Sequence, residues 1–389
     1  MNYCRKVWVI MKKELLHIFR DRILFSITIF AALVMTFLLG GIYIQGKVTH
    51  MPVVIFDQDQ TDLSRMIVRG FEDSERFTLV RFVSTYQEMN QVIEKEQAYM
   101  GIVIPPHLEE NIKNDKGAEV ACIVNNSNLL VSSNMANNAN AVIGTLCAGI
   151  TMKVMEGYGI NHTKAYRAVT ALSFRSRLWY NPTNSYVVFM LLGLTGTIFQ
   201  QIIMLGVAIS FVKEKEQETW RQLIFSDLTP GQLIWGKSLT YFLLYFINAL
   251  IICAINCFYF KIPLRGSVGL FLLTSALFTI VILTFSMLMS VLSKNTAQAI
   301  QSMMLVTMPS LLVSGYTWPY QNLPLVLKGF SNVLPLTYFL RAEKAIALMG
   351  AGFDVVWPQL AILLLMVIIL LPLTVFLVKR NMMRSKAFQ

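Results

Sequence analysis

Six long runs of uncharged, largely apolar residues constrain this chain more than any other feature of its sequence. They cover residues 23–44, 185–212, 238–260, 267–293, 295–318 and 355–378. Even the shortest run would form a helix about 33 Å long, enough to cross a hydrocarbon core of about 30 Å. Because a soluble protein rarely sustains such runs, the sequence predicts a polytopic α-helical membrane protein with six transmembrane helices.

Residues 1–22 precede the first run and form a candidate amphipathic helix. Trp8, Met11, Leu15, Ile18 and Phe19 fall at helical spacing, with basic residues opposite them. Such a helix can lie along the membrane interface, and the same basic residues can equally act as a juxtamembrane orientation signal. The polar leader and the long apolar run, with no small-residue cleavage site, predict an anchor and not a cleaved signal peptide.

Lysine and arginine residues are distributed unevenly around the six runs. The tail before the first run, the loops after the second and fourth runs, and the tail at 379–389 together carry 15 of them, against five in the short loops on the other side. By the positive-inside rule both termini are predicted to be cytoplasmic. The net charge of +11 is therefore interpreted as an orientation signal, and no nucleic-acid partner is expected.

The long segment 45–184 is nearly neutral, with 13 basic and 14 acidic residues, and is predicted to form an extracytoplasmic domain. Strands are expected at residues 53–56, 78–83, 99–104 and 119–124. Helices are expected at residues 61–71, 85–97 and 128–153. Alternating strands and helices predict a small mixed α/β domain between the first two transmembrane helices. Its carboxylates Asp57, Asp59 and Asp62 fall in a polar turn, where solvation is their expected role.

One motif matches the phosphate-binding pattern GxxxxGK[ST] through Gly231, Gly236, Lys237 and Ser238. A P-loop needs small residues whose backbone N–H groups surround a phosphate between a strand and a helix. Here the intervening residues are bulky and no apolar strand precedes them. Thr229 instead predicts an N-cap, with Pro230 at the first helical position and Gln232 completing a capping box, so the motif is interpreted as a helix start.

The cytoplasmic segment 213–237 opens with dense alternating charge and continues with bulky apolar residues. Two readings stay open: a solvated helix end with i,i+3 ion pairs, or a surface that docks into a partner's groove. The residues proposed for such docking share charge or apolar bulk on one tight turn: Lys213, Glu214, Lys215, Glu216, Glu218, Thr219, Arg221, Leu223 and Phe225.

The six runs contain no Asp, Glu, Lys, Arg or His. Ion-coupled transporters normally place ionisable residues in the membrane, so the sequence argues against a secondary active transporter. Energy for uphill transport would then have to enter through a cytoplasmic partner. The polar residues that do occur are expected to hydrogen-bond between helices, with a substrate path as the alternative: Gln200, Gln201, Asn248, Asn256, Gln298 and Gln301.

Nothing in the sequence has the spacing of a catalytic or metal site, so no enzyme and no cofactor are predicted. The four histidines are scattered, and Cys122 and Cys147 leave the question of a disulfide open. Between the last two runs, residues 319–354 are interrupted by prolines and are predicted to form re-entrant or interfacial helices on the outer side. Arg341, Glu343 and Lys344 are expected at that outer surface.

Taken in order, several weak motifs make the chain resemble the permeases of type-2 ABC (ABC-2) exporters, specifically the drug-efflux-like members with a large domain after the first span. The resemblance covers essentially the whole chain. Its motifs are Lys12, Lys13 and Glu14 with Arg20 and Asp21, the stretch 213–219, the stretch 228–237, and Ser314, Gly315, Pro319, Leu323, Pro324, residues 334–338, Arg341 and Gly350. Glu218 departs from the family pattern, which usually has Gly there.

The resemblance implies a non-enzymatic permease subunit of an ATP-driven exporter in a bacterial inner membrane. Two permeases, identical or paralogous, would associate with cytoplasmic ABC ATPase subunits that bind the ATP and Mg²⁺. A periplasmic adaptor is often found with the outward domain in this family. Segment 213–225 would then be the coupling element, and residues 3–22 the interfacial helix at the ATPase. The substrate would be a drug-like, lipid-like or other amphipathic molecule. The alternative is a membrane-anchored scaffold or envelope component acting through its extracytoplasmic domain.

Overall fold

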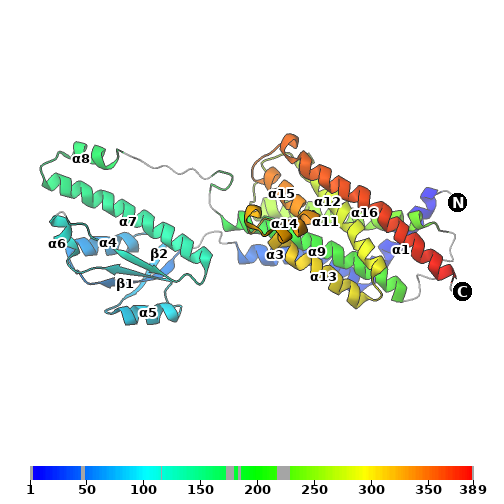
Figure 1. Cartoon of the computed structure of the whole chain (residues 1–389), viewed down its shortest axis with the longest axis horizontal. Coiled ribbons are helices and arrows are strands. Elements are labelled where there is room, and N and C mark those ends of the chain that lie inside the picture. Colours follow the sequence, from blue (N-terminus) through cyan, green and yellow to red (C-terminus); the bar gives the residue numbers. More distant parts are fainter. Residues whose placement is uncertain are drawn as a thin grey trace. The chain divides into compact units, whose positions relative to one another are not determined.

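The computed structural model describes residues 3–44, 49–114, 116–171, 179–182, 185–216 and 228–387 (Figure 1). The chain divides into two compact units. We call Met1–Gly46 together with Leu178–Gln389 the helical unit, and Lys47–Arg177 the sheet unit. Each unit buries its own hydrophobic core.

Six helices in the described part of the chain are long and apolar enough to cross a membrane. Each coincides with most of one predicted run, so the prediction of six such helices is confirmed. The first consists of α2 (Arg22–Phe25), a π-helical turn η1 (Ser26–Phe30) and α3 (Ala31–Ile42). The others are α9 (Tyr186–Glu216), α11 (Pro230–Ala254) with the π-helical turn η2 (Ile255–Tyr259), α12 (Val268–Leu292), α13 (Thr296–Val313) and α16 (Phe353–Ala387).

Helices α9 and α11, like α16, extend beyond the uncharged runs that predicted them. Helix α9 continues to Glu216 and α11 begins at Pro230, whereas the runs end at residue 212 and begin at residue 238. An uncharged run marks the length that a hydrocarbon core requires, while a helix continues until a capping residue or a partner ends it. Charged residues therefore belong to the ends of both helices.

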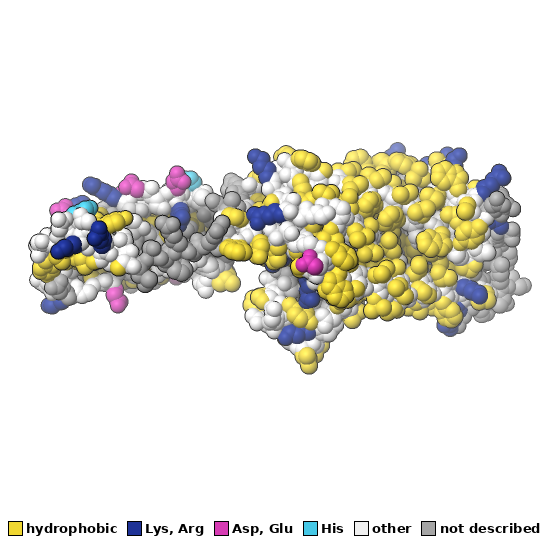
Figure 2. Space-filling model, turned by 90° about the horizontal axis from the view of Figure 1, so that it is seen from above, with side chains coloured by type: hydrophobic (Ala, Val, Ile, Leu, Met, Phe, Trp, Pro, Cys, Tyr) yellow, Lys and Arg dark blue, Asp and Glu magenta, His cyan; other side chains and the backbone are white. Residues whose placement is uncertain are grey.

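Helix α9 is the central helix of the helical unit. In the most apolar 18-residue stretch of α9, 67% of the residues are buried, whereas in that of α16 only 17% are buried. The exposed side of α16 carries large apolar side chains: Leu364, Leu365, Ile368, Ile369 and Phe376. Hydrophobic side chains also cover most of the face of the helical unit seen in Figure 2. A surface of this size and polarity is typical of a protein that contacts lipid.

The π-helical turn η1 allows a hydrogen bond to form with α11. In a π turn the backbone hydrogen bonds are displaced by one residue, which leaves a carbonyl oxygen available to other donors. Here the Thr28 carbonyl accepts a hydrogen bond of 2.6 Å from the Asn248 side chain, and both residues are buried. The contact fits the predicted role of Asn248 in helix–helix hydrogen bonding.

The predicted amphipathic helix before the first span is α1 (Tyr3–Arg20). Ile10, Glu14 and Ile18, spaced four residues apart, are its buried face, and this face packs against α11. Trp8 and Phe19, expected on the apolar face, are exposed. The helix therefore has one face bound to the helical unit and a second, exposed apolar stripe, which is the pattern of an interfacial helix.

The segment between α13 and α16 forms a short 3-10 turn η3 (Tyr320–Asn322), α14 (Leu325–Val333) and α15 (Pro335–Ala347). The expectation that Glu343 lies at an outer surface is wrong, because only 5% of it is exposed. On α15 it follows Phe339 by one turn and precedes Ile346, and all three belong to the buried face of the helix. Helical spacing, not polarity, decides its environment.

The described residues of the sheet unit form a four-stranded sheet with strand order β2-β1-β3-β4. The first three strands are parallel and β4 is antiparallel to β3. Strands and helices follow one another as β1 (Met51–Asp57), α4 (Asp62–Glu72), β2 (Phe77–Phe82), α5 (Tyr86–Glu94), β3 (Met100–Ile104), α6 (Leu108–Lys113), β4 (Ala121–Val124), α7 (Leu129–Gly157) and α8 (His162–Val169). The expected strands and helices are all present, whereas α6 and α8 were not predicted.

Helices cover both faces of this sheet (Figure 1). Val53 and Ile55 of β1 pack in one core with α4 and α7. Val54 and Phe56 pack in a second core with α5. The alternation follows from the pleat, which turns successive side chains to opposite faces. The cysteines Cys122 of β4 and Cys147 of α7 are exposed and free.

The stability of the sheet unit is expected to depend on the buried side chains of strand β3. Ile102→Ala removes a fully buried side chain and is expected to cost about 2–5 kcal/mol. Hydrogen–deuterium exchange of the full chain should then show faster exchange of the amides of β1 and β3. The matched control is Ile123→Ala on β4, whose side chain is 38% exposed, and equal acceleration by both changes would contradict the assignment of the core.

Candidate functional site

The last turn of α9 carries four consecutive charged residues, Lys213, Glu214, Lys215 and Glu216. All four belong to the predicted coupling residues. Consecutive residues of an α-helix are turned by about 100° from one another. At the end of a central helix, each of the four therefore reaches a different neighbouring element. We call these residues and their partners the α9 hub.

Glu214 lies in a buried cluster with Lys237 of α11 and with Lys13 and Glu14 of α1. The Lys237 Nζ lies 2.6 Å from Glu214 Oε2 and 3.3 Å from Glu14 Oε1. The Lys13 Nζ lies 3.2 Å from Glu14 Oε1 and also pairs with Glu214. The Lys237 and Glu14 side chains are fully buried, whereas Lys13 is partly exposed. The cluster thus joins three helices.

Charge balance makes this burial tolerable. Two ammonium groups face two carboxylates, so no charge in the cluster lacks a counter-charge. The Lys237 Nζ also lies 4.2 Å from the centre of the Phe211 ring, a distance typical of a cation–π contact. Burial by itself lowers the pKa of Lys13, but the carboxylates of Glu14 and Glu214 outweigh it and raise that pKa. Lys13 therefore stays charged at neutral pH.

Lys213 pairs with Asp21, the residue between α1 and α2. Asp21 is the N-cap of α2, because its side chain accepts hydrogen bonds from the backbone N–H groups of Ile23 and Leu24. Partial burial alone would raise the pKa of Asp21, but the hydrogen bonds from Lys213 and from these backbone groups hold it below its ordinary value. This pair fixes the corner between α1 and the first membrane-spanning helix.

Lys215 closes the end of α12. Its Nζ donates hydrogen bonds to the carbonyl oxygens of Ser290, Val291 and Ser293, at 2.8, 2.9 and 3.2 Å. The last carbonyl groups of a helix have no partner within the helix and carry the negative end of its dipole. A lysine is therefore well suited to this position.

Glu216 acts in the same way at the start of α13. It accepts hydrogen bonds of 2.7 Å from both the backbone N–H and the hydroxyl of Thr296. A carboxylate is favourable here because the first N–H groups of a helix are unpaired and carry the positive end of its dipole. Together the four residues of the α9 hub connect α9 to α1, α2, α11, α12 and α13.

The phosphate-loop-like motif is explained by the same cluster. Thr229 and Gln232 form the predicted capping box at the start of α11. Lys237 is occupied by two carboxylates, and a Cβ at Gly236 would lie only 2.6 Å from Ile10 Cγ2 of α1. The glycine and lysine of the motif thus allow α1 to pack closely on α11 and pair with it. The prediction of a helix start is confirmed.

The rest of the predicted coupling residues, Glu218, Thr219, Arg221, Leu223 and Phe225, lie outside the described residues. Three of the polar residues within the spans hydrogen-bond to another helix, as predicted: Asn248 to the Thr28 carbonyl, Asn256 to Thr195, and Gln200. Gln200 donates a hydrogen bond of 3.3 Å to Ser310, so it bridges α9 and α13. The remaining ones are half-buried or exposed: Gln201, Gln298 and Gln301.

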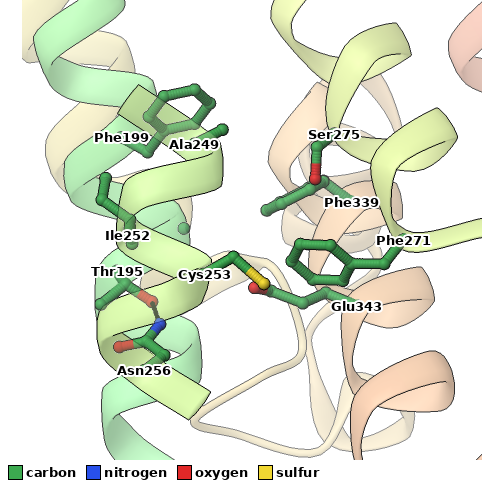
Figure 3. A pocket seen from close by; sticks show the side chains of 11 residues that line it. Thr195, Phe199, Ala249, Ile252, Cys253, Asn256, Phe271, Ser275, Phe339 and Glu343 are labelled. Atoms are coloured by element: carbon green, nitrogen blue, oxygen red, sulfur yellow. Dashed lines mark hydrogen bonds between the residues drawn. The ribbon is translucent and has the colours of Figure 1, made fainter. Parts of the chain in front are cut away.

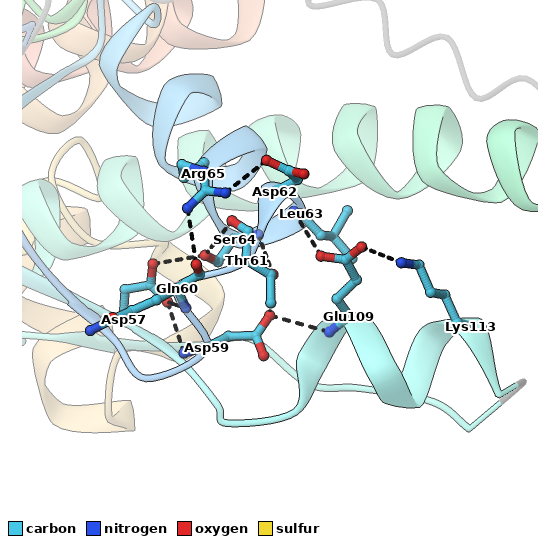
Figure 4. Close-up of polar contacts among 10 residues, drawn as sticks. All are labelled: Asp57, Asp59, Gln60, Thr61, Asp62, Leu63, Ser64, Arg65, Glu109 and Lys113. Atoms are coloured by element: carbon cyan, nitrogen blue, oxygen red, sulfur yellow. Dashed lines mark hydrogen bonds and ion pairs between the residues drawn. The ribbon is translucent and has the colours of Figure 1, made fainter.

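In the sheet unit two of the three carboxylates of the predicted polar turn, Asp57 and Asp59, are engaged with backbone groups, whereas Asp62 is exposed as expected and pairs with Arg65 (Figure 4). Asp57 accepts hydrogen bonds from the N–H groups of Asp59 and Gln60, and Asp59 accepts from those of Leu108 and Glu109. They are more than solvated, because they tie the end of β1 to the start of α6. No cluster of metal-binding side chains was found among the residues that the structure describes.

The comparison with protein families agrees with a membrane component of this architecture. Residues 22–376 match the model of a family described as ABC-2 family transporter protein. The chain belongs to this family. The match includes all six membrane-spanning helices up to most of α16, and the sheet unit between the first two. As a family member, the chain is the permease component of an ABC transporter and a multi-pass membrane protein.

Named relatives resemble this ABC-2 permease over most of its length. The probable multidrug ABC transporter permease YbhR of Escherichia coli K12 is 27% identical over 355 residues, which cover 91% of this chain and 93% of that protein. The inner membrane transport permease YhhJ of the same strain is 23% identical over 366 residues, covering 92% and 93%. Permeases are the non-catalytic components of ABC transporters, so the prediction of a non-enzymatic subunit is confirmed, and the family implies an ATPase partner.

Sequence reasoning missed the partners of the α9 hub in this permease. Glu14 and Lys237 were noted only as parts of motifs, and Asp21 as one residue of a basic segment. One signal was available: Glu14 falls four residues after Ile10 and four before Ile18, so a carboxylate occupies the apolar face of α1. A charge in such a position predicts a buried counter-charge, although it does not identify which lysine provides it.

The buried cluster predicts a large effect of one substitution. Lys237→Met leaves the carboxylates of Glu14 and Glu214 with Lys13 alone, and is expected to destabilise the permease by about 3–5 kcal/mol. The measurement is the midpoint of thermal unfolding of the purified full chain. The control is Lys12→Met, which changes an exposed lysine on α1 next to Lys13. Adding Glu14→Gln to Lys237→Met should restore part of the loss, and equal midpoints for the two single variants would contradict the cluster's role.

Proposed function

We propose that this chain is the permease of an ATP-driven exporter, in which the α9 hub transmits the movement of a separate ATPase to the membrane-spanning helices. The observation that carries the proposal is the set of contacts made by Lys213, Glu214, Lys215 and Glu216 with five other helices. The family supports an ATPase partner. The direction of transport and the role of the hub are the proposal.

The orientation in the membrane follows from charge. Both termini lie at the same end of the helical unit (Figure 1), as an even number of spans requires. The loops and tails at that end hold most of the basic residues outside the sheet unit. We therefore assign the α9 hub and both termini to the cytoplasm, and the sheet unit to the extracytoplasmic side. Relatives named for a multidrug transporter and an inner membrane permease support a bacterial inner membrane location.

Force reaches the bundle through the segment that follows α9. Residues 217–227 follow α9 and precede α11 in the sequence, and they include the predicted docking residues Leu223 and Phe225. When an ATPase moves this segment, the last turn of α9 moves with it. Because each residue of that turn is paired with a different helix, the displacement is distributed over the bundle instead of bending a single helix.

The complete exporter requires further subunits. ATP and Mg²⁺ bind to the ABC ATPase partners in this proposal, and a second copy of this chain or a paralogue completes the permease. A periplasmic adaptor on the sheet unit is consistent with the family resemblance. Amphipathic molecules are the proposed substrate class, because the exposed surface of the helical unit is apolar and the substrate can enter from the membrane.

Two classes of variant separate docking from transmission. Leu223→Asp and Phe225→Asp are expected to abolish co-purification of the ATPase, because a charge disrupts an apolar contact. Lys215→Met and Glu216→Gln are expected to keep the ATPase bound but to lower transport of a labelled amphipathic substrate by about tenfold at unchanged ATP hydrolysis, since each loses charged hydrogen bonds. Reconstituted vesicles provide the transport and ATPase measurements.

The control for both classes is Lys294→Met, an exposed lysine in the loop between α12 and α13, which should leave association and transport unchanged. ATPase association that survives every docking change would overturn the docking assignment. A chain that binds its ATPase but moves no substrate under any condition would favour the membrane-anchored scaffold. Full transport in the Lys215 and Glu216 variants would refute transmission through the α9 hub.

A further inference from the structure

A small cavity lies inside the helical unit between α9, α11, α12 and α15 (Figure 3). Its volume is about 30 Å³, enough for one group of the size of a water molecule. Glu343 reaches into it from α15, and its carboxyl group comes close to Cys253 of α11 in Figure 3. The cavity lies against residues 195–199 of α9 and residues 271–275 of α12, so more than ten residues of α9 separate it from the α9 hub.

Two acceptor oxygen atoms of this cavity lack a hydrogen-bond partner among the described residues. They are Glu343 Oε2 and Asn256 Oδ1. The other end of the Asn256 amide is satisfied, since its Nδ2 donates a hydrogen bond of 3.3 Å to Thr195. A buried acceptor without a donor is costly, and a buried carboxylate without a counter-charge is more so. The missing partner of both oxygens is a donor of hydrogen bonds.

The walls of the cavity favour a positively charged donor. Three phenylalanine residues line it, Phe199, Phe271 and Phe339, and the faces of aromatic rings attract cations. Among the described lining residues there is no Lys, Arg or His. A carboxylate, an amide oxygen and aromatic rings together are the groups that proteins use to bind an ammonium group, and here the protein does not supply the cation itself.

We propose that this cavity is the binding site for the ammonium group of an amphiphilic primary amine. The head group is held by Glu343 and Asn256 against the three phenylalanine rings. Because the cavity accommodates only one small group, the apolar remainder of the molecule lies outside it. This assignment rests on the proposed function, since it names a substrate class for the exporter, but the site is tested below without ATP and without an ATPase.

Binding is coupled to the release of a proton. Burial raises the pKa of Glu343 well above its ordinary value, which favours the protonated carboxyl group in the empty site. When the ammonium group enters, the carboxyl O–H bond breaks, the proton leaves to the solvent, and the carboxylate remains paired with the cation. The titratable groups that face Glu343 are Cys253 of α11 and Tyr316, which follows α13. Amine affinity therefore rises with pH until the empty site ionises.

A hydrophobic carbodiimide tests the site directly, because it reacts with protonated carboxyl groups in apolar surroundings. The full chain in lipid nanodiscs is treated with dicyclohexylcarbodiimide, and the modified peptides are identified by mass spectrometry. Glu343 is expected to be labelled, and n-octylammonium is expected to protect it. The neutral isostere 1-octanol is the matched control ligand and should not protect. Absence of label on Glu343, or equal protection by octanol, would overturn the proposal.

Two variants complete the test. Glu343→Gln should lose both the label and the thermal stabilisation that n-octylammonium gives to the wild-type chain. Phe271→Leu keeps the carboxyl group and should still be labelled, but about fivefold more n-octylammonium should be needed for protection, as expected for the loss of one cation–π contact. Unchanged protection in Phe271→Leu, or stabilisation that persists in Glu343→Gln, would refute the ammonium site. Either result would refute the ammonium site only. The proposed function is tested separately, by the ATP-driven transport of the α9 hub variants.

Discussion

The ion pairs between Lys237 and the carboxylates of Glu14 and Glu214 determine how the helical unit is assembled at the end that carries both termini. Each partner is costly to bury alone, so α1, α9 and α11 can only come together in the arrangement that pairs them. The close packing of α1 on α11 at Gly236 depends on this arrangement, and so do the contacts of Lys215 and Glu216 with the ends of α12 and α13. Hydrophobic burial stabilises the bundle, whereas these charges select one register of its helices.

Much of the fold could be predicted from the sequence, because membrane helices and α/β units follow from local patterns. Uncharged runs identify spans since a bilayer tolerates little else. In the sheet unit, the strand at residues 53–56 follows from a short continuous apolar run, and the helix at residues 61–71 from its helical spacing. The capping box at Thr229 was readable for the same reason. These features depend on neighbours within a few residues.

The functional contacts could not be predicted because they join distant parts of the chain. Lys237 pairs with Glu14, more than 200 residues away, and no local pattern indicates which carboxylate a lysine meets. The charge of Glu343 predicts a surface position, whereas its place on the buried face of α15 puts it inside the bundle. The structure instead makes it an ionisable group within the bundle, supplied by a connecting helix and not by a spanning one. Counting charges within the six runs could not detect it.

The α9 hub also limits how this helix can move. If α9 turned about its own axis by one residue, Lys215 would face the partners of Glu214, and positive groups would meet positive groups. Such a rotation would break all four sets of contacts at once. A tilt of α9 that carries the neighbouring helices with it keeps each residue opposite its own partner. The contacts at the end of α9 therefore resist rotation of the helix about its axis but transmit its displacement to the neighbouring helices.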